Sequence, residues 1–170
     1  MSNSSSSVER AWPDPLSGDE LTVQTRFLDF LRATAVNKLA GLSREQAVAT
    51  PLPASPRTSA LGVVKHLIAV ERWWLSVEAG GAALPSLWMG SPDPSWDVAA
   101  EDDPASVVAA YQEEWAHSAA SLAGLAADDR TRRSGEFTVR WVLAHVVQET
   151  ARHVGHLDAL RELADGEVGE

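Results

Sequence analysis

Three histidines and a glutamate recur along one stretch of the sequence at the spacing of helical turns. In residues 145–156, His145, Glu149 and His153 follow one another at every fourth position, and His156 falls on nearly the same stripe. Residues four apart share one face of a helix, with β-carbons about 5–6 Å apart. The apolar residues that continue this stripe are Val142, Leu160 and Leu163. A carboxylate buried beside imidazoles is costly unless a cation or a hydrogen-bonding partner compensates it.

A second helical stretch, residues 61–75, carries one titratable residue on its apolar face. On a helical wheel of about 100° per residue, His66 lies among small and apolar side chains, whereas Lys65, Glu71 and Arg72 point elsewhere. The residues that share the face of His66 are Gly62, Val63, Ala69, Val70, Trp73 and Val77. A single buried histidine is more often a satisfied core residue than a ligand, so this stretch alone does not indicate a site.

Taken together, the two stretches allow two interpretations. In the first, Glu149 and its histidines form a polar network that satisfies itself within the core. In the second, Glu149 and His153 chelate a divalent metal, and His66 completes the set from the facing helix. Two imidazoles and one carboxylate suit zinc, the metal we favour, and also nickel, manganese or ferrous iron. Three protein ligands leave positions open for water or substrate, which is typical of a catalytic site.

Three neighbouring residues are secondary candidates. His156 lies one turn from the set and is a proton shuttle, a partner of Glu149, or only a polar residue lining the pocket. Arg152 lies about 60° from the row around the helix. It either binds an anionic group of a thiol or substrate, or pairs with an acid of a neighbouring helix. Trp73 lies on the apolar face of the other stretch and is a candidate wall of the site.

The remaining histidines and tryptophans have more ordinary expectations. We expect His145 to support the site or to pack, and His117 to be a surface or core residue. Trp141 is expected in the core. Trp88 and Trp96 lie in a proline-rich stretch, where they either cover a pocket or anchor the loop.

The elements that must position these residues are helical. Apolar periodicity, Ala and Leu content and capping residues predict helices over about 19–40, 59–79, 104–126 and 138–164. Ser17 and Ser59 are candidate N-caps. No stretch alternates as a half-buried strand does, so the fold class is all-α and the architecture a four-helix bundle. The connection over about 80–103 is far longer than antiparallel neighbours need, which is typical of a crossover or a functional cover.

We divide the chain into a flexible, serine-rich N-terminal arm (1–17), one bundle domain (18–166) and a short C-terminal tail (167–170). The 170 residues contain 14 Lys and Arg against 24 Asp and Glu, a formal charge of −10, which argues against a nucleic-acid partner. No apolar run reaches the roughly 18 residues of a membrane span, and the N-terminus lacks a signal peptide. Without cysteine, the chain supplies no thiolate of its own. We expect a soluble, cytoplasmic protein.

The two polar stretches also resemble a known family. The run 141–162, together with 64–67 and 71–74, is similar to the DinB-like proteins (DinB/YfiT superfamily), specifically a mini-circle-protein-like branch of unknown function. The likeness covers about Leu21 to Gly166. It implies an up-down-down-up bundle with a long crossover between its second and third helices. It also implies one metal held by His66, Glu149 and His153. Many members have a histidine where this chain has Glu149, a departure shared with mycothiol-dependent maleylpyruvate isomerases.

Characterised DinB-like proteins are S-transferases or isomerases that use a low-molecular-weight thiol, mycothiol or bacillithiol. The resemblance therefore implies a metal-dependent thiol S-transferase with a small-molecule thiol and an electrophile as partners. The chemistry is consistent, because a metal-bound thiol loses its proton readily and the thiolate is the nucleophile. Two alternatives stay open on the same residues: a non-catalytic bundle that binds metal or forms a homodimer, and a metal-dependent hydrolase.

Overall fold

Four long helices build the protein in the computed structural model, which describes residues 7–88 and 90–169. They are α1 (Glu20–Asn37), α3 (Ala60–Glu71), α4 (Pro104–Leu122) and α5 (Val139–Asp165), with α3 continued by the π-helix η1 (Arg72–Ala79). A short helix α2 (Arg44–Val48) and a 3₁₀ turn η2 (Pro94–Trp96) lie in the connections. The described residues contain no strand, which confirms the all-α prediction.

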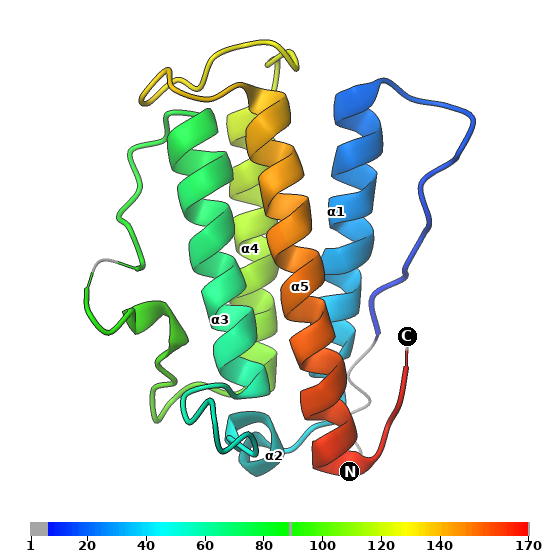
Figure 1. The fold of residues 1–170 in the computed structure, drawn as a ribbon, viewed down its shortest axis with the longest axis vertical. Coiled ribbons are helices and arrows are strands. Elements are labelled where there is room, and N and C mark those ends of the chain that lie inside the picture. The colour runs from blue at the N-terminus through cyan, green and yellow to red at the C-terminus, as the bar shows by residue number, and fades with distance from the viewer. Residues whose placement is uncertain (1–6, 89, 170) are drawn as a thin grey trace.

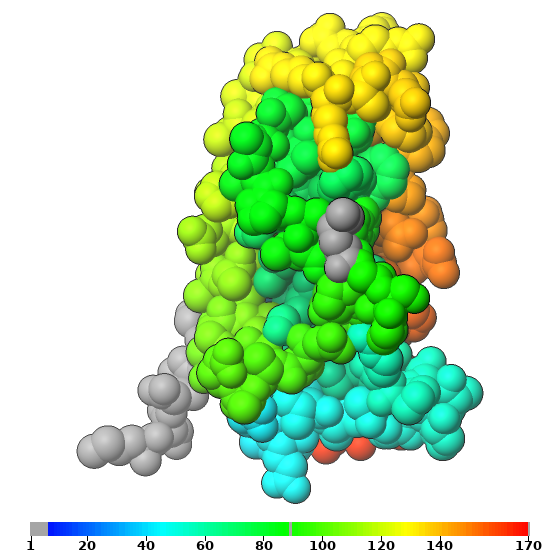
Figure 2. Space-filling model, turned by 90° about the vertical axis from the view of Figure 1, so that its left-hand side faces the viewer, coloured from blue at the N-terminus to red at the C-terminus, as the bar shows by residue number. Residues whose placement is uncertain are grey.

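The helices follow the expected up-down-down-up order. In Figure 1, α3 and α4 run in one direction, and α1 and α5 run in the other. Because α3 and α4 are parallel, the chain must return along the length of the bundle, and the crossover over 80–103 makes that return. Helix α5 packs against both α1 and α3, and α3 together with η1 packs against α4. Figure 2 shows the crossover spread over the outer face of α3.

Side-chain caps account for most of the helix starts. Asp19, Ser59 and Asp103 each accept a hydrogen bond from a backbone N–H in the first turn of α1, α3 and α4. This satisfies a donor that the helix itself leaves free. The prediction of Ser17 as the first cap is wrong, because its hydroxyl donates to Asp14 instead. Helix α5 ends at Asp165 and is capped by Gly166, which adopts φ +82°, a conformation that favours glycine.

Two helix ends and the elements α2 and η1 differ from the sequence prediction, which had a regular helix over residues 72–79. Helix α1 ends at Asn37 rather than near residue 40, and α4 ends at Leu122 rather than near residue 126. The helix α2 was not predicted, although Ser43 and Gln46 form a capping box at its start. A helix of five residues buries too small a face to give a clear apolar period.

Two clusters of buried apolar side chains form the core, one towards each end of the bundle. The first includes Leu39, Leu61, Leu67, Leu157 and Leu160, and the second includes Leu28, Leu75, Val142, Leu143 and Val146. On α5, Val146 belongs to one cluster and Val154 to the other. Glu149 and His153 lie between these two positions, so the bundle places them at mid-height between two apolar layers.

The segments outside the bundle contact it. Val8 exchanges two hydrogen bonds with Asn37, and Trp12 stacks on Phe30 at 4.2 Å between ring centroids. Residues 1–6 of the predicted N-terminal arm lie outside the described residues. In the C-terminal tail, Glu167 pairs with Arg161 at 2.5 Å. Among the described residues, no helix combines the length and the apolar character that a membrane crossing requires.

Candidate functional site

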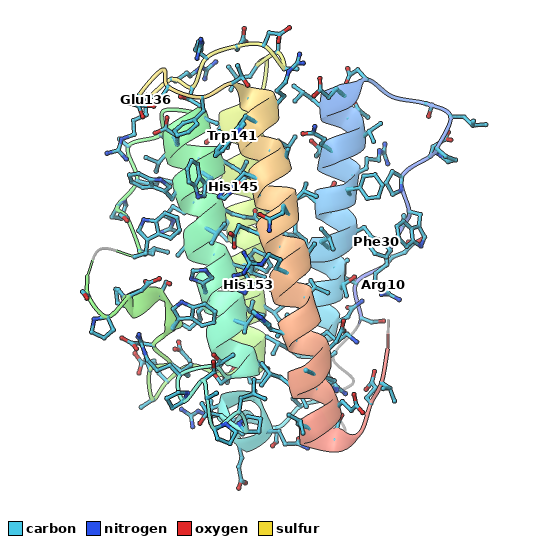
Figure 3. All side chains as sticks on the ribbon, viewed as in Figure 1. Arg10, Phe30, Glu136, Trp141, His145 and His153 are labelled. Carbon is cyan, nitrogen blue, oxygen red and sulfur yellow. The ribbon has the colours of Figure 1, made fainter. Side chains whose placement is uncertain are left out.

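The three residues predicted to bind metal lie close together where α3 faces α5. The rings of His66 on α3 and His153 on α5 are 4.9 Å apart between centroids and tilted by 70°. On α5, one turn before His153, a carboxylate oxygen of Glu149 lies 3.4 Å from Nε2 of His153. Figure 3 shows His153 at mid-height on α5, beside α3. The helix pairing therefore brings together residues that are more than eighty positions apart in sequence.

Both imidazoles are held in the neutral form. Burial, together with charge repulsion from His66, His156 and Arg152, lowers the pKa of His153 to about 4. Burial also lowers the pKa of His66, although the carboxylates of Asp93 and Glu149 oppose this. A histidine must be neutral to offer a lone pair to a metal. Both rings meet that condition at neutral pH.

The crossover supplies contacts to His66 that sequence reasoning missed. Ser95 Oγ lies 2.8 Å from Nδ1 of His66, and a carboxylate oxygen of Asp93 lies 3.7 Å from the same nitrogen. Trp96, predicted to cover a pocket or to anchor the loop, stacks on the His66 ring at 4.3 Å and also faces His153 at 5.5 Å. The only sequence signal for this arrangement was the Asp-Pro-Ser turn itself, which does not reveal where the turn lies.

His156 and Arg152 lie on the outer side of the row. Nδ1 of His156 is 3.3 Å from Nδ1 of His153, so His156 can exchange a proton with a ring of the site. Arg152 is 65% exposed and lies 3.8 Å from Glu149 on its own helix. Its ion pair is therefore with Glu149 and not with an acid of a neighbouring helix. Its exposed guanidinium remains open to an anionic group.

The other aromatic candidates gather nearer to the start of α5. His145 stacks on Trp141 at 5.2 Å and meets the edge of Trp74 at 4.7 Å; Figure 3 shows Trp141, His145 and His153 in succession along α5. Trp141 is 46% exposed, so its prediction as a core residue is wrong. Trp73 packs beside Trp88 at 5.9 Å. The contacts of His145 with Trp141 and Trp74 are packing contacts between aromatic rings.

Arg133 contacts the candidate Trp73, and His117 lies on another helix, α4. The guanidinium of Arg133 lies 4.2 Å from the centre of the Trp73 ring, a cation–π contact. His117 on α4 has a side chain that is 43% exposed and lies 3.8 Å from Glu114. His117 therefore lies at the surface, as one of its two predicted alternatives has it.

The donor atoms are chemically suited to a divalent metal, although the side chains are not arranged in a coordination geometry. Within residues 7–88 and 90–169, no group of three or more His, Asp or Glu side chains is arranged as it must be to hold a metal ion. His66, Glu149 and His153 nevertheless offer two neutral imidazoles and a carboxylate whose side chain is 23% exposed. Such nitrogen and oxygen donors suit zinc and its neighbours.

A comparison with protein-family models identifies the family of the chain. A family model described as Mycothiol-S-transferase matches residues 23–166, which include all four long helices apart from the first residues of α1. No curated protein matches the chain. The matched family is a DinB-like family, which confirms the resemblance drawn from the two polar stretches. The chain belongs to the mycothiol S-transferase family.

Proposed function

We propose that this protein is a metal-dependent S-transferase that joins a mycothiol-type thiol to a small electrophile. Family membership supports the thiol and the transfer of its sulfur. The observation that carries the proposal is the meeting of His66, Glu149 and His153 between α3 and α5. A divalent metal at these residues, with zinc preferred, would favour ionisation of the thiol to the nucleophilic thiolate.

The chain's own residues prepare the site for such a reaction. Because the chain has no cysteine, the reacting sulfur comes from the co-substrate. Trp96 covers the rings of His66 and His153, which limits the access of water to them. Glu149 contributes a negative charge beside two neutral imidazoles.

We assign roles to three further residues. His156 receives the proton released by the thiol, because it lies against His153 and is exposed to solvent. The exposed guanidinium of Arg152 binds an anionic group of the thiol or the electrophile. Trp73 forms part of the wall on the side of Trp88. We place the reaction in the cytoplasm, where small thiols are kept reduced.

Metal content tests the ligand assignment. The purified protein is expected to contain about one zinc per chain by elemental analysis, because three protein donors make one open site. His66→Ala and His153→Ala should lose this zinc and keep their helical circular dichroism. Glu149→Gln should also lose it, whereas Glu149→His, which restores a donor, should keep it. His117→Ala on the exposed face of α4 is the matched control. Stoichiometric zinc in His66→Ala would refute the assignment.

A thiol-transfer assay tests the activity. We expect the zinc-loaded protein to conjugate mycothiol to a simple electrophile, and a chelator to abolish the reaction. Bacillithiol and glutathione serve as comparison thiols. Zinc binding without transfer to any of the three would favour the metal-binding module. A dimer on gel filtration that persists in chelator, without transfer, would favour the dimerising bundle. Chelator-sensitive ester hydrolysis without transfer would favour the hydrolase.

A further inference from the structure

The turn η2 of the crossover lies against His66 through a buried hydroxyl. Ser95 is 5% exposed, and its Oγ lies 2.8 Å from Nδ1 of His66. The backbone N–H of Ser95 donates to Asp93 at 2.9 Å, which fixes the serine in the turn. Ser95 of the crossover is thus buried against His66 of α3, which lies 29 positions earlier in the chain.

The charge beside this contact favours one position for the ring proton of His66. A serine hydroxyl both donates and accepts, so Ser95 alone is compatible with either tautomer of His66. A carboxylate oxygen of Asp93 lies 3.7 Å from the same Nδ1. An ionised carboxylate is attracted to an N–H and repelled by a lone pair. The pair therefore favours a proton on Nδ1, which leaves the lone pair on Nε2.

The plane of the ring is fixed as well. Trp96, the residue after Ser95, stacks on His66 at 4.3 Å with an angle of 18° between the rings. Arg57 holds both ends of the turn η2, because it donates to the carbonyl of Asp93 and to a carboxylate oxygen of Asp97, each at 2.7 Å. The serine and the tryptophan therefore act on the ring from an anchored segment.

Close backbone packing brings the turn to α3. A β-carbon placed on Gly62, one turn before His66, would lie only 3.0 Å from the carbonyl oxygen of Trp96. The glycine thus permits an approach that any larger residue would oppose. The crossover, which the topology needs only as a connection, is docked at one specific turn of α3.

We propose that Ser95 and Asp93 are positioning residues for His66, which hold the proton on Nδ1 and so present Nε2 as the free donor of the ring. Hydrogen bonds of this kind from an outer partner orient metal-binding histidines and strengthen them as ligands. The consequence for metal binding rests on the proposed function. The tautomer itself does not, because it is a property of the metal-free protein.

Nitrogen NMR of the metal-free, ¹⁵N-labelled protein at about pH 8, where imidazoles are neutral, reads the tautomer directly. His66→Gln identifies the His66 signals by their loss. In the wild type, Nδ1 should give the signal of a protonated nitrogen and Nε2 that of an unprotonated one. Asp93→Asn, which removes the charge, and Ser95→Ala, which removes the hydroxyl, should each move both signals towards the other tautomer, whereas Ser95→Thr, which keeps the hydroxyl, should leave them as in the wild type. Ser91→Ala, at an exposed serine of the same loop, should change neither.

Zinc titration measures the consequence. Ser95→Ala should weaken zinc binding by about 10–100-fold, as loss of an outer hydrogen bond typically does, and Ser95→Thr should recover most of it. If Ser95→Ala does not fold, Asp93→Asn provides the same reading of the tautomer. Unchanged His66 signals in the folded variants overturn the proposal, whatever zinc does. A tautomer change in a protein that binds no zinc supports the positioning role and refutes the proposed function.

Discussion

Glu71 and Glu149 are acids within the bundle that meet different partners. Glu71 is fully buried and accepts hydrogen bonds from Arg32 Nε at 3.0 Å and from the Tyr111 hydroxyl at 2.7 Å. Glu149 is partly exposed, and its close neighbour His153 is neutral because its pKa is about 4. The charge of Glu71 is therefore balanced within the protein. The charge of Glu149 meets only the exposed guanidinium of Arg152, at 3.8 Å, among the described residues, so it can still attract a metal cation.

A third acid, Glu78, makes a pH-dependent contribution to the stability of the fold at the end of η1. Burial alone would raise the pKa of Glu78, but hydrogen bonds from Ser134 and Thr131 outweigh burial and lower the pKa from the ordinary value of 4.5. An acid whose pKa is lowered in the folded state stabilises the fold above its unfolded pKa. This stabilisation is lost as the pH falls through the folded pKa.

Replacing Thr131 tests this contribution of Glu78 to stability. Thr131→Val removes a hydroxyl that donates to Glu78 at 2.7 Å. At neutral pH we expect the free energy of unfolding to fall by about 1–3 kcal/mol, because a buried charge loses a donor. The difference should shrink as the pH drops below 4.5 and Glu78 becomes protonated. Urea unfolding across this pH range measures it.

The control is Thr150→Val on α5. The hydroxyl of Thr150 donates to the backbone carbonyl of Val146 at 2.8 Å, and a carbonyl does not titrate. The cost of Thr150→Val should therefore stay the same from neutral to acid pH. Equal pH dependence of the two variants would contradict the role assigned to Glu78.

At the scale of elements, the sequence predicts the helices, because their apolar period is local. It does not predict where a loop packs, because tertiary contacts determine that position. The four helices and the meeting of His66 with Glu149 follow from apolar faces that must be buried against one another. The contact of Ser95 with His66 does not follow, because it depends on how the whole crossover folds back over α3. No local pattern in a proline-rich loop specifies such a docking point.

The π-helix η1 departs from the regular α-helix that the sequence predicts over residues 72–79. Hydrogen bonds to the fifth residue widen the turns of η1, so a wheel of about 100° per residue does not describe this stretch. Contacts from another loop hold this end of the helix, since the backbone N–H groups of Arg132 and Arg133 donate to the carbonyls of Ala79 and Glu78. Those partners lie more than fifty positions away, so residues 72–79 alone could not indicate the π-helix.

The same end of the helix depends on a close approach between η1 and α4. A β-carbon on Gly80 would lie 2.4 Å from the β-carbon of Ser121, which is shorter than any real contact. Gly80→Ala must therefore push the two helices apart. We expect a loss of about 1–3 kcal/mol in the free energy of unfolding, as is typical of overpacking. Thermal or urea unfolding measures this change.

Gly155→Ala is the matched control, with the opposite sign expected. Gly155 is exposed within α5, and nothing lies within 4 Å of a β-carbon placed there. Alanine should stabilise the helix by about 0.5–1 kcal/mol, because it loses less backbone entropy on folding. If both alanines stabilised the protein, the close approach at Gly80 would be refuted.

Across the whole molecule, buried charged groups connect the three long helices other than α5, namely α1, α3 and α4. Arg32 on α1, Glu71 on α3 and Tyr111 on α4 meet in one hydrogen-bonded group. Arg72 and Ser76 of η1 bind the buried Glu114 of α4 in the same way. Each group satisfies its acid from two partners, which a buried carboxylate requires. These groups fix α1, α3 and α4, against which α5 presents Glu149 and His153.

The Tyr111 hydroxyl tests how much the fold depends on this connection. Tyr111→Phe keeps the ring in the core but removes a hydrogen bond to the fully buried Glu71. We expect a loss of about 1.5–3 kcal/mol in the free energy of unfolding, the range for hydrogen bonds to charged groups. Ser118→Ala on the same helix is the control, because its hydroxyl is also buried but has no partner among the described residues. Removing that hydroxyl should cost nothing or stabilise the protein. Equal losses in the two variants, measured by urea unfolding, would show that Glu71 does not depend on Tyr111.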